Sequence, residues 1–444
     1  MCCFRRGERG TTLPKRPGWR GRGGALGVLL GLAVCPLWAQ TPKGGWATFQ
    51  DASRRLGIIG CVWEDTSQLF TNATQRIRFQ NGQKRTEVNG VTVWMNHPPE
   101  GVTSNTWRIA VRDLDFLSLA ILPDTEAEKP KNLHVLLDPG HGGMDVGAVS
   151  EAPFLQEKAF SLAMANRLGP LLEKAGFTVS YTRTNDVALS LSQRAAMAKT
   201  VKADLLISLH ANHAANTKAV GFETYVVPPS GYSGTANGSR RNAWRPGNNN
   251  DFQSTLLGFA VQRQFCASQT NRVDRGLKRA SYYVLRETSC PAVLIEFGFL
   301  SNSGEAGEML AETWQDAHAQ LVADAVTRYA KRIEALDGAV AEKREADRKA
   351  NEAWRAKLAQ RNAAKRDAGQ VAARPVKRPS SADGVPQQLA APFPLAPFPS
   401  NDDQDEPAAQ PPPPRPVAVE RGTNTAPLVV GRLIDFYMKE NPDK

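Results

Sequence analysis

Between residues 134 and 333, strand-like and helix-like segments alternate along the chain, and this alternation restricts the possible folds more than any other feature of the sequence. The short apolar runs that we interpret as strands are His134–Asp138, Thr178–Thr182, Asp204–Leu209, Gly221–Val227, Tyr282–Leu285 and Ala292–Phe297. The longer stretches, with apolar residues at helical spacing, are Leu155–Ala175, Leu191–Val201, Gln253–Thr270 and Glu305–Ile333. Such alternation predicts one α/β domain, over residues 133–333, in which helices flank a mostly parallel sheet.

The segment that precedes this domain has a different pattern. Over residues 46–125, runs such as Gln75–Phe79 and Val91–Trp94 alternate between polar and apolar side chains. The pairs Asn81-Gly82 and Asn89-Gly90 between such runs are typical of tight hairpin turns. We therefore predict a small β-rich module before the α/β domain.

The composition changes again beyond residue 333. Residues 334–378 are predicted to be a charged helix or linker, since residues 342–378 carry twelve Lys/Arg and five Asp/Glu with few large apolar side chains. Residues 379–426 are rich in proline and too poor in apolar surface to fold, so we predict a disordered tail there. Residues 427–444 form a short apolar segment that can dock on the chain itself or on an envelope protein partner.

The first 39 residues have the pattern of a secretory signal peptide. A basic leader is followed by the apolar run Ala25–Val34, and Ala39 is a small residue at the expected cleavage point before Gln40. The run is too short to span a bilayer, so no transmembrane segment is expected after cleavage. A lipoprotein signal is the alternative, because Leu32–Cys35 loosely resembles a lipobox. Either interpretation predicts an exported protein of the periplasm or cell envelope.

Export also changes the interpretation of charge and cysteine content. The leader has seven Lys/Arg and one Glu, a net charge of +6, so only +5 of the total +11 remains after cleavage. This weakens any argument for nucleic-acid binding from net charge, and no nucleic-acid partner is expected. Cys61, Cys266 and Cys290 remain, an odd number that allows at most one disulfide without identifying the pair.

Four residues of the α/β domain stand where metal-binding or acid–base chemistry needs them. His141 follows the first strand in a glycine-rich turn, His210 ends an apolar strand, and Glu296 interrupts an apolar strand. Glu157 lies near the start of the helix that follows the first strand. In open α/β sheets, ligands bind at the carboxyl ends of the strands, where we expect all four side chains to meet.

Each of these residues also has an ordinary structural explanation when it is taken alone. A histidine after a strand is usually structural, and a glutamate in a first helical turn suits the helix dipole. A buried glutamate without a partner is harder to explain in that way. Convergence of the four at one sheet edge favours a catalytic zinc site, with two histidines and one carboxylate as ligands and a second carboxylate for proton transfer.

Four motifs carry a resemblance to a known family: Leu136–Gly143 (LLDPGHGG), Gln156–Lys158 (QEK), Ser208–Asn212 (SLHAN) and Pro291–Asn302 (PAVLIEFGFLSN). In this order they resemble the zinc-dependent N-acetylmuramoyl-L-alanine amidases. The resemblance implies a phosphorylase/hydrolase-like α/β fold, Zn²⁺ bound by His141, Glu157 and His210, and Glu296 as the catalytic residue. It also implies a peptidoglycan substrate, cut between N-acetylmuramic acid and L-alanine, and a hydrolase of cell-wall remodelling or cell separation.

Two other functions remain as alternatives. A zinc peptidase would cut within the peptidoglycan stem peptide, and an inactive cell-wall scaffold would use the fold only for binding. The scaffold predicts the loss of a ligand or of the catalytic glutamate, and all four residues are present.

One segment bears on regulation. Residues 228–250 are rich in proline, glycine and asparagine, which favours an open loop over a helix that would plug the site. Our hypothesis is that this loop, with Trp244, borders the substrate groove and that the enzyme needs no activator.

Overall fold

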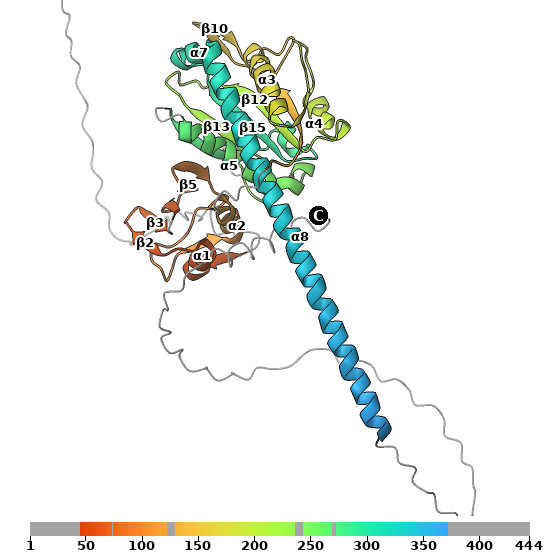
Figure 1. Ribbon diagram of the computed structural model, residues 1–444. Coiled ribbons are helices and arrows are strands. Elements are labelled where there is room, and N and C mark those ends of the chain that lie inside the picture. Colours follow the sequence, from red (N-terminus) through yellow and green to blue (C-terminus); the bar gives the residue numbers. More distant parts are fainter. Residues whose placement is uncertain (1–44, 73, 122–128, 236–242, 269–271, 372–444) are drawn as a thin grey trace, which may run out of the picture. The chain divides into compact units, whose positions relative to one another are not determined.

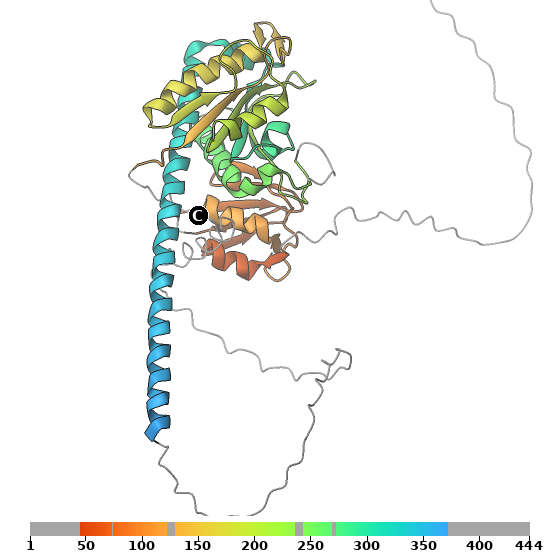
Figure 2. The same cartoon turned by 90° about the vertical axis from the view of Figure 1, so that its right-hand side faces the viewer.

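The computed structural model describes residues 45–72, 74–121, 129–235, 243–268 and 272–371. The predicted signal peptide, the proline-rich tail and the apolar C-terminal segment lie outside these ranges, and the expectations about them stay predictions. Figures 1 and 2 show the described part as coloured ribbon.

A mixed sheet of eleven strands runs through the described residues in the order β11-β8-β12-β15-β13-β14-β6-β5-β4-β3-β2. The first four strands in this order are parallel, β13 is antiparallel to β15, and β14 is parallel to β13. The strands are β2 (Gly60–Trp63), β3 (Ser67–Thr71), β4 (Arg76–Gln80), β5 (Arg85–Val88), β6 (Val91–Trp94), β8 (His134–Pro139), β11 (Thr178–Tyr181), β12 (Leu205–Asn212), β13 (Phe222–Val226), β14 (Asp274–Arg279) and β15 (Ala292–Phe299). Two further pairs stand outside this sheet: β1 (Trp46–Thr48) with β7 (Arg108–Ala110), and β9 (Val149–Glu151) with β10 (Phe154–Gln156).

Helices cover both faces of the parallel part of the sheet. The helices of the described residues are α1 (Phe49–Leu56), α2 (Val111–Ala120), α3 (Glu157–Lys174), α4 (Leu191–Thr200), the 3-10 helix η1 (Pro246–Asn250), α5 (Asp251–Ser268), α6 (Tyr283–Arg286), α7 (Ser303–Leu310) and α8 (Glu312–Val371), of which α1 and α2 belong to the N-terminal module. Helices α3, α5 and α8 share one buried apolar cluster, and α4 and α6 contribute to a second.

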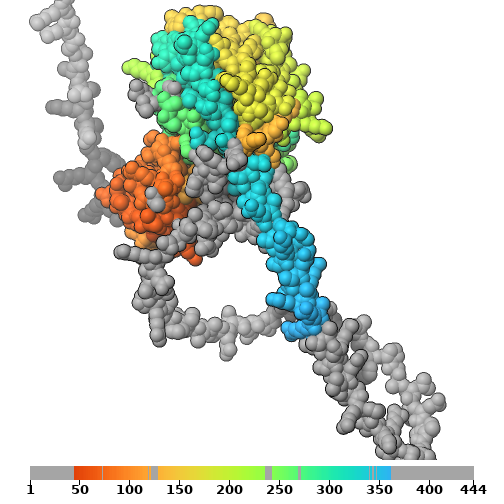
Figure 3. Space-filling model, viewed as in Figure 1, coloured from red at the N-terminus to blue at the C-terminus, as the bar shows by residue number. Residues whose placement is uncertain are grey.

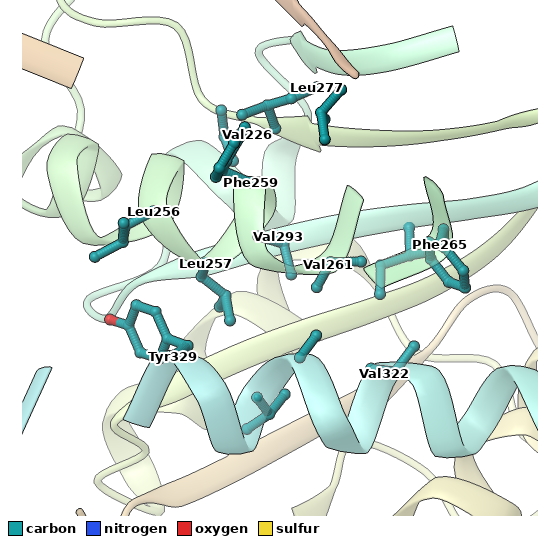
Figure 4. Packing of buried hydrophobic residues seen from close by; sticks show 14 of the residues in the cluster. Val226, Leu256, Leu257, Phe259, Val261, Phe265, Leu277, Val293, Val322 and Tyr329 are labelled. Carbon is teal, nitrogen blue, oxygen red and sulfur yellow. The ribbon is translucent and has the colours of Figure 1, made fainter. Parts of the chain in front are cut away.

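The two clusters follow the alternation of side chains along the strands. On β15, Val293, Ile295 and Phe297 join the cluster of α3, α5 and α8, whereas Ala292 and Leu294 join that of α4 and α6. This is the two-residue period that puts successive side chains of a strand on opposite faces. Figure 4 shows the first cluster, in which α5 packs with Val293 of the sheet and with Val322 and Tyr329 of α8.

The N-terminal module contains the predicted antiparallel strands, β2 to β6, and also two helices that the sequence pattern did not indicate. Its core is aromatic, since Phe70 and Phe79 pack edge-to-face against the buried Trp107. The module's sheet does not end at β6. Val93 of β6 pairs with Leu277 of β14, so the sheet of the module continues into that of the α/β domain.

Two predicted elements of the α/β domain were wrong, and three of its strands, β9, β10 and β14, were not predicted. Tyr282–Leu285, predicted as a strand, lies mostly within the short helix α6, because a four-residue apolar run does not distinguish the two structures. The helix predicted over Glu305–Ile333 is two helices, interrupted at Ala311, which has an extended backbone. Strand β14 has the polar sequence DRGLKR, which gives no apolar alternation to detect.

Helix α8 continues far beyond the apolar core. Its buried apolar positions end near Leu336, and the side chains of residues 348–361 are all exposed, in the blue part of the chain in Figure 3. The composition of this exposed part is rich in Ala, Arg, Lys and Glu, residues that favour a helix even where tertiary contacts do not stabilise it. Arg348 adds ion pairs to Glu345 and Glu352 at helical spacing.

The structure also describes the three cysteines and the apolarity of the helices. Among the residues described, Cys61, Cys266 and Cys290 are free thiols, so the possible disulfide does not form between them. No helix within the described ranges combines the length and apolarity needed to cross a bilayer.

Candidate metal centre

His141, Glu157 and His210 meet at the carboxyl edge of the parallel strands. One potential ligand atom from each lies within 4.8 Å of the other two. His141 follows β8, His210 lies near the end of β12, and Glu157 is the first residue of α3. The three residues predicted as ligands from the sequence are therefore brought together, while their role as metal ligands stays a prediction.

Glycines make room for this cluster. A Cβ atom on Gly140 would lie 2.3 Å from the His210 ring, and one on Gly147 would lie 2.5 Å from Oε2 of Glu157. His141 itself has φ +59°, a left-handed conformation that is uncommon outside glycine. The glycine-rich turn after β8 thus lets the backbone pass close to the rings and directs His141 toward Glu157.

The carboxylate of Glu157 joins the two imidazoles. It lies 3.1 Å from Nε2 of His141 and 2.8 Å from Nδ1 of His210, and it accepts the backbone N–H groups of Ala148 and Ala211. Burial by itself raises the pKa of Glu157, but the two rings outweigh burial and hold that pKa far below its ordinary value. Glu157 is therefore an anion at neutral pH.

Asp145 supports His141 from the other side of the ring. Its Oδ1 lies 2.8 Å from Nδ1 of His141, which leaves Nε2 directed at Glu157. Burial lowers the pKa of His141, whereas Glu157 and Asp145 raise it, and the net shift is upward. The sequence interpretation did not include Asp145. The only signal was an acidic residue four positions after a histidine in a glycine-rich loop.

Glu296 is buried next to this cluster. Its Cα atom pairs with that of His210 between β15 and β12, and its Oε2 atom is buried without a hydrogen-bond partner. Burial, followed by the negative charges of Glu157 and Glu223, raises the pKa of Glu296 well above its ordinary value. A carboxyl group in this position can hold a proton and exchange it with a neighbouring molecule.

A buried ion pair fixes the base of the His141 turn. Asp138, at the end of β8, accepts hydrogen bonds from Arg194, Thr182 and Ser208. Arg194 also donates to the backbone carbonyls of Pro139 and His141. The turn that carries His141 is thus tied to α4 and to two strands.

The cluster opens into a cavity of about 930 Å³. His141, Glu157, His210 and Glu296 all line it, and its other walls include Tyr282, Tyr283 and Leu191. The two tyrosines were missed as site residues because their segment was predicted to be a strand. Trp244, which we expected at the groove, is exposed and is not among the lining residues. His213, by contrast, is exposed and does line the cavity.

The chemistry of the cluster fits a zinc ion. Two imidazole nitrogens and one carboxylate oxygen are donors that zinc prefers, and three protein ligands leave a position for water or substrate. Asp145 supplies the carboxylate-to-histidine contact that is common behind metal ligands. The glycine contacts described above show that the backbone leaves no space for larger side chains around the donors.

Comparison with known proteins identifies relatives of the α/β domain. A family profile described as N-acetylmuramoyl-L-alanine amidase matches residues 135–328. The uncharacterized protein YqiI of Bacillus subtilis is 33% identical over 214 residues, which are 48% of this chain and 93% of that protein. The N-acetylmuramoyl-L-alanine amidase LytC of the same organism is 31% identical over 195 residues, 44% of this chain and 35% of LytC. The match thus spans about a third of LytC.

Similar chains are also found among solved structures. The catalytic domain of CwlV, an N-acetylmuramoyl-L-alanine amidase from Bacillus (Paenibacillus) polymyxa, is 32% identical and matches 45% of this chain and 99% of its own, with a TM-score of 0.38. An N-acetylmuramoyl-L-alanine amidase from Clostridium difficile 630 is also 32% identical, covers 45% of this chain and 97% of its own, and has a TM-score of 0.38.

Proposed function

Because the chain belongs to the N-acetylmuramoyl-L-alanine amidase family, we propose that it hydrolyses the amide bond between N-acetylmuramic acid and L-alanine in peptidoglycan. The proposal includes a zinc ion bound by His141, Glu157 and His210, and Glu296 as the acid–base residue. The family description and the relatives named as amidases support the reaction. The arrangement of the four side chains supports the mechanism.

The proposed mechanism rests on the arrangement of four side chains. Three metal-competent side chains lie within 4.8 Å of one another, and Glu296, whose buried Oε2 has no hydrogen-bond partner, lines the same cavity. A buried carboxyl oxygen without a partner costs stability, so a purely structural role gives little reason to keep one. Sites that perform chemistry commonly keep such groups.

A zinc ion at this site would supply Lewis-acid chemistry, namely a lower pKa for water and polarisation of the substrate carbonyl. The residues of the chain bind the ion and the substrate and orient the groups around them. Glu157 contributes a negative charge, and Asp145 holds the His141 ring with Nε2 toward the cluster. Tyr282 and Tyr283, on the cavity wall, offer aromatic surface and hydroxyl groups to the substrate.

Glu296 transfers the proton in this mechanism. The oxygen of water attacks the lactyl carbonyl carbon, and Glu296 accepts the proton that the water loses. The bond between carbon and nitrogen then breaks, and the same carboxyl group delivers the proton to the amine of L-alanine. Burial suits Glu296 to hold the transferred proton, because it raises the pKa of the carboxyl group above that of an exposed glutamate.

Mass spectrometry of digested sacculi tests the reaction. The protein is incubated with purified peptidoglycan, and the soluble products are compared with those of the Glu296→Gln variant. We expect free stem peptides that begin with L-alanine and glycan that has lost its peptides. Shortened peptides that are still attached to the sugar would contradict the amidase and support the zinc peptidase. Binding to sacculi without any cleavage would support the inactive scaffold.

We also propose that the protein acts outside the cytoplasm. The relatives named as probable cell wall amidases support this location, as does the predicted signal peptide. N-terminal sequencing of the protein from an envelope fraction should give Gln40 as the first residue. An N-terminus at Cys35 that carries lipid would support the lipoprotein alternative instead, and an intact N-terminus in the cytoplasm would contradict export.

A further inference from the structure

We propose that Glu223 is a positioning residue of the catalytic site, and that the N-terminal module holds it in place through strand β14. The inference rests on the proposed amidase function for its activity assay. It assigns a role in catalysis to a module that the sequence suggested was a separate unit.

Glu223 lies directly beside Glu296 in the sheet. Their Cα atoms pair between the antiparallel strands β13 and β15, and Glu223 is 2% exposed. Tyr225, two residues further on, belongs to the buried cluster on the α4 and α6 face, so Glu223 points to that face as well. Leu294 of β15 belongs to the same cluster, which puts Glu296 on that face too. The two carboxyl groups are therefore neighbours.

The first oxygen of Glu223 fixes Asn212. Oε1 accepts hydrogen bonds from Nδ2 of Asn212 and from the hydroxyl of Tyr225, each at 2.7 Å. The amide oxygen of Asn212 accepts the backbone N–H of His213 at 2.8 Å, so both ends of the amide are held in one orientation. Asn212 lines the cavity, at the point where the pairing of β12 and β15 shifts register after His210.

The second oxygen of Glu223, Oε2, contacts two positively charged side chains of β14. Arg275 donates to Oε2 at 2.7 Å, and Lys278 forms an ion pair with the same atom. Two like charges directly opposite each other in a sheet are destabilising, and a buried carboxylate needs a partner. Arg275 and Lys278 provide that partner, so Glu223 can stay charged next to Glu296. The position of Glu223 therefore depends on the position of β14.

The N-terminal module contacts β14 on both sides of Arg275. Nε1 of Trp94 donates to the carbonyl of Arg275 at 3.0 Å, and the N–H of Thr92 donates to Oδ2 of Asp274 at 2.6 Å. A Cβ atom on Gly276 would lie 2.7 Å from Thr92, which shows how closely the two strands approach. Strand β6 of the module thus fixes the backbone that presents Arg275 and Lys278 to Glu223.

The first test replaces Glu223 by glutamine, which keeps the shape and removes the charge. With a soluble muramoyl peptide as substrate, we expect kcat to fall by roughly tenfold or more and KM to change by less than about threefold. The melting temperature and the bound zinc of the variant are measured beside the wild type. A variant that is folded and loaded with zinc but keeps the wild-type kcat would overturn the proposal.

The second test uses two matched tryptophan substitutions in the module. Trp94→Phe removes the indole N–H that bonds to Arg275, whereas Trp63→Phe changes a tryptophan that packs against Phe49 and Phe70 inside the module. We expect Trp94→Phe to lower kcat and Trp63→Phe to leave it unchanged at a similar loss of melting temperature. Equal effects of the two variants on kcat would overturn the link to the module. This pair decides the question even if Glu223→Gln does not fold.

A readout without substrate separates this inference from the amidase proposal. In protein labelled with ¹⁵N-asparagine, the side-chain amide of Asn212 gives a signal that is assigned with the Asn212→Asp variant. We expect this signal to shift in Trp94→Phe and to stay in place in Trp63→Phe. If the wild type cleaves no substrate yet the signal shifts in this way, the proposed function fails and the positioning contact stands. An unmoved signal in both variants would overturn the positioning contact.

Discussion

At the scale of single residues, the site is built from side chains with separate tasks. Glu296 lines the cavity but forms no hydrogen bond with either histidine, so its removal should leave the proposed metal ligands in place. His210, in contrast, forms a hydrogen bond with Glu157. Substitutions at the two positions should therefore affect binding and catalysis differently.

Glu296→Gln should lower kcat by about 10²–10⁴-fold, the usual contribution of general acid–base catalysis. Glutamine has nearly the same shape, so it keeps the packing but cannot exchange a proton. The measurement is the steady-state rate on a soluble muramoyl peptide, with zinc content measured on the same sample. A rate within tenfold of the wild type would show that Glu296 is not the proton-transfer group.

Asp145→Asn should weaken metal binding by roughly 10–100-fold, as is typical for carboxylates behind a histidine ligand. The amide can still contact Nδ1 of His141 but lacks the negative charge that orients the ring. Competition with a zinc chelator measures the change in dissociation constant. Lys218→Gln, a change at an exposed position in the loop after β12, serves as the control and should bind metal like the wild type.

Arg194→Met should destabilise the fold by about 3–5 kcal/mol, because Asp138 would keep its charge in the interior without a cation. The side chains of the pair are only 3% and 1% exposed. Urea denaturation gives the free energy of unfolding. The matched control is Arg348→Met on the exposed part of α8, where ion pairs contribute little. Equal stability of the two variants would contradict the structural role of the buried pair.

The convergence of His141, Glu157 and His210 was predictable from sequence because their positions relative to the strands place them at one edge of the sheet. His141 follows a strand and a glycine-rich turn, and Glu296 interrupts an apolar strand. Asp145 and Glu223 were not predictable in this way, because an acidic residue in a loop or in a mixed strand has many ordinary explanations. Their partners are also distant in sequence, as with Lys278 and Glu223, so no local spacing reveals the contact.

At the scale of elements, the helix α8 carries a buried histidine that makes stability depend on pH. His318 stacks on Trp314 with ring centroids 3.4 Å apart, and its Nδ1 lies 2.7 Å from the carbonyl of Trp314. Its Nε2 is buried without a partner. Burial, reinforced by Arg272 and only partly offset by the Trp314 carbonyl, lowers the pKa of His318 to about 4.

This shift predicts a loss of stability in acid. Because the ordinary pKa of a histidine is near 6.5, the unfolded chain binds a proton between about pH 6.5 and pH 4 and the folded chain does not. Stability is therefore complete above pH 6.5, falls as the pH drops toward 4 and changes no further for this group below that. The loss should reach at most about 3 kcal/mol.

The variant His318→Phe isolates this effect, since phenylalanine keeps the stacking on Trp314 and does not titrate. Urea denaturation of the metal-free protein at pH 7.5 and pH 5 should show a smaller loss for the variant than for the wild type. His213→Gln, at an exposed position, should behave like the wild type. An identical loss in all three proteins would contradict a neutral, buried His318.

Elements with strong patterns were predicted well, and those without were not. The parallel strands β8, β12 and β15 are apolar runs, so their positions follow from sequence. Strand β14 consists largely of charged residues, two of which, Arg275 and Lys278, form ion pairs with Glu223. Because of these charged residues, β14 lacks the apolar alternation by which strands are usually predicted. The interruption at Ala311 has no glycine or proline to mark it, so the separation of α7 from α8 was not apparent.

At the scale of the whole molecule, the sequence suggested two separate folded units, whereas one sheet continues through both. The two units are connected by contacts such as the strand pairing of Val93 with Leu277 and the ion pair of Arg112 with Asp251. These residues are far apart in the sequence, so no local pattern indicates the contacts. The module therefore covers one edge of β14. An exposed strand edge promotes self-association, and pairing with β6 leaves β14 without such an edge.

Production of residues 129–371 alone should give a less stable protein than residues 45–371. Without the module, β14 loses β6, one of its two neighbours, and the buried Arg279 should become exposed to solvent near Asp251. We expect a lower melting temperature and a concentration-dependent increase in size by light scattering. Equal melting temperatures and a monomeric short form would show that the module contributes nothing to the stability of the α/β part.

We propose that His141, Glu157 and His210 bind one zinc ion. Elemental analysis of the purified protein by mass spectrometry measures this, with three samples prepared in parallel. We expect one zinc ion per chain in the wild type and in Glu296→Gln, and almost none in His210→Ala. Equal zinc in all three proteins, or none in the wild type after incubation with the metal, would contradict it.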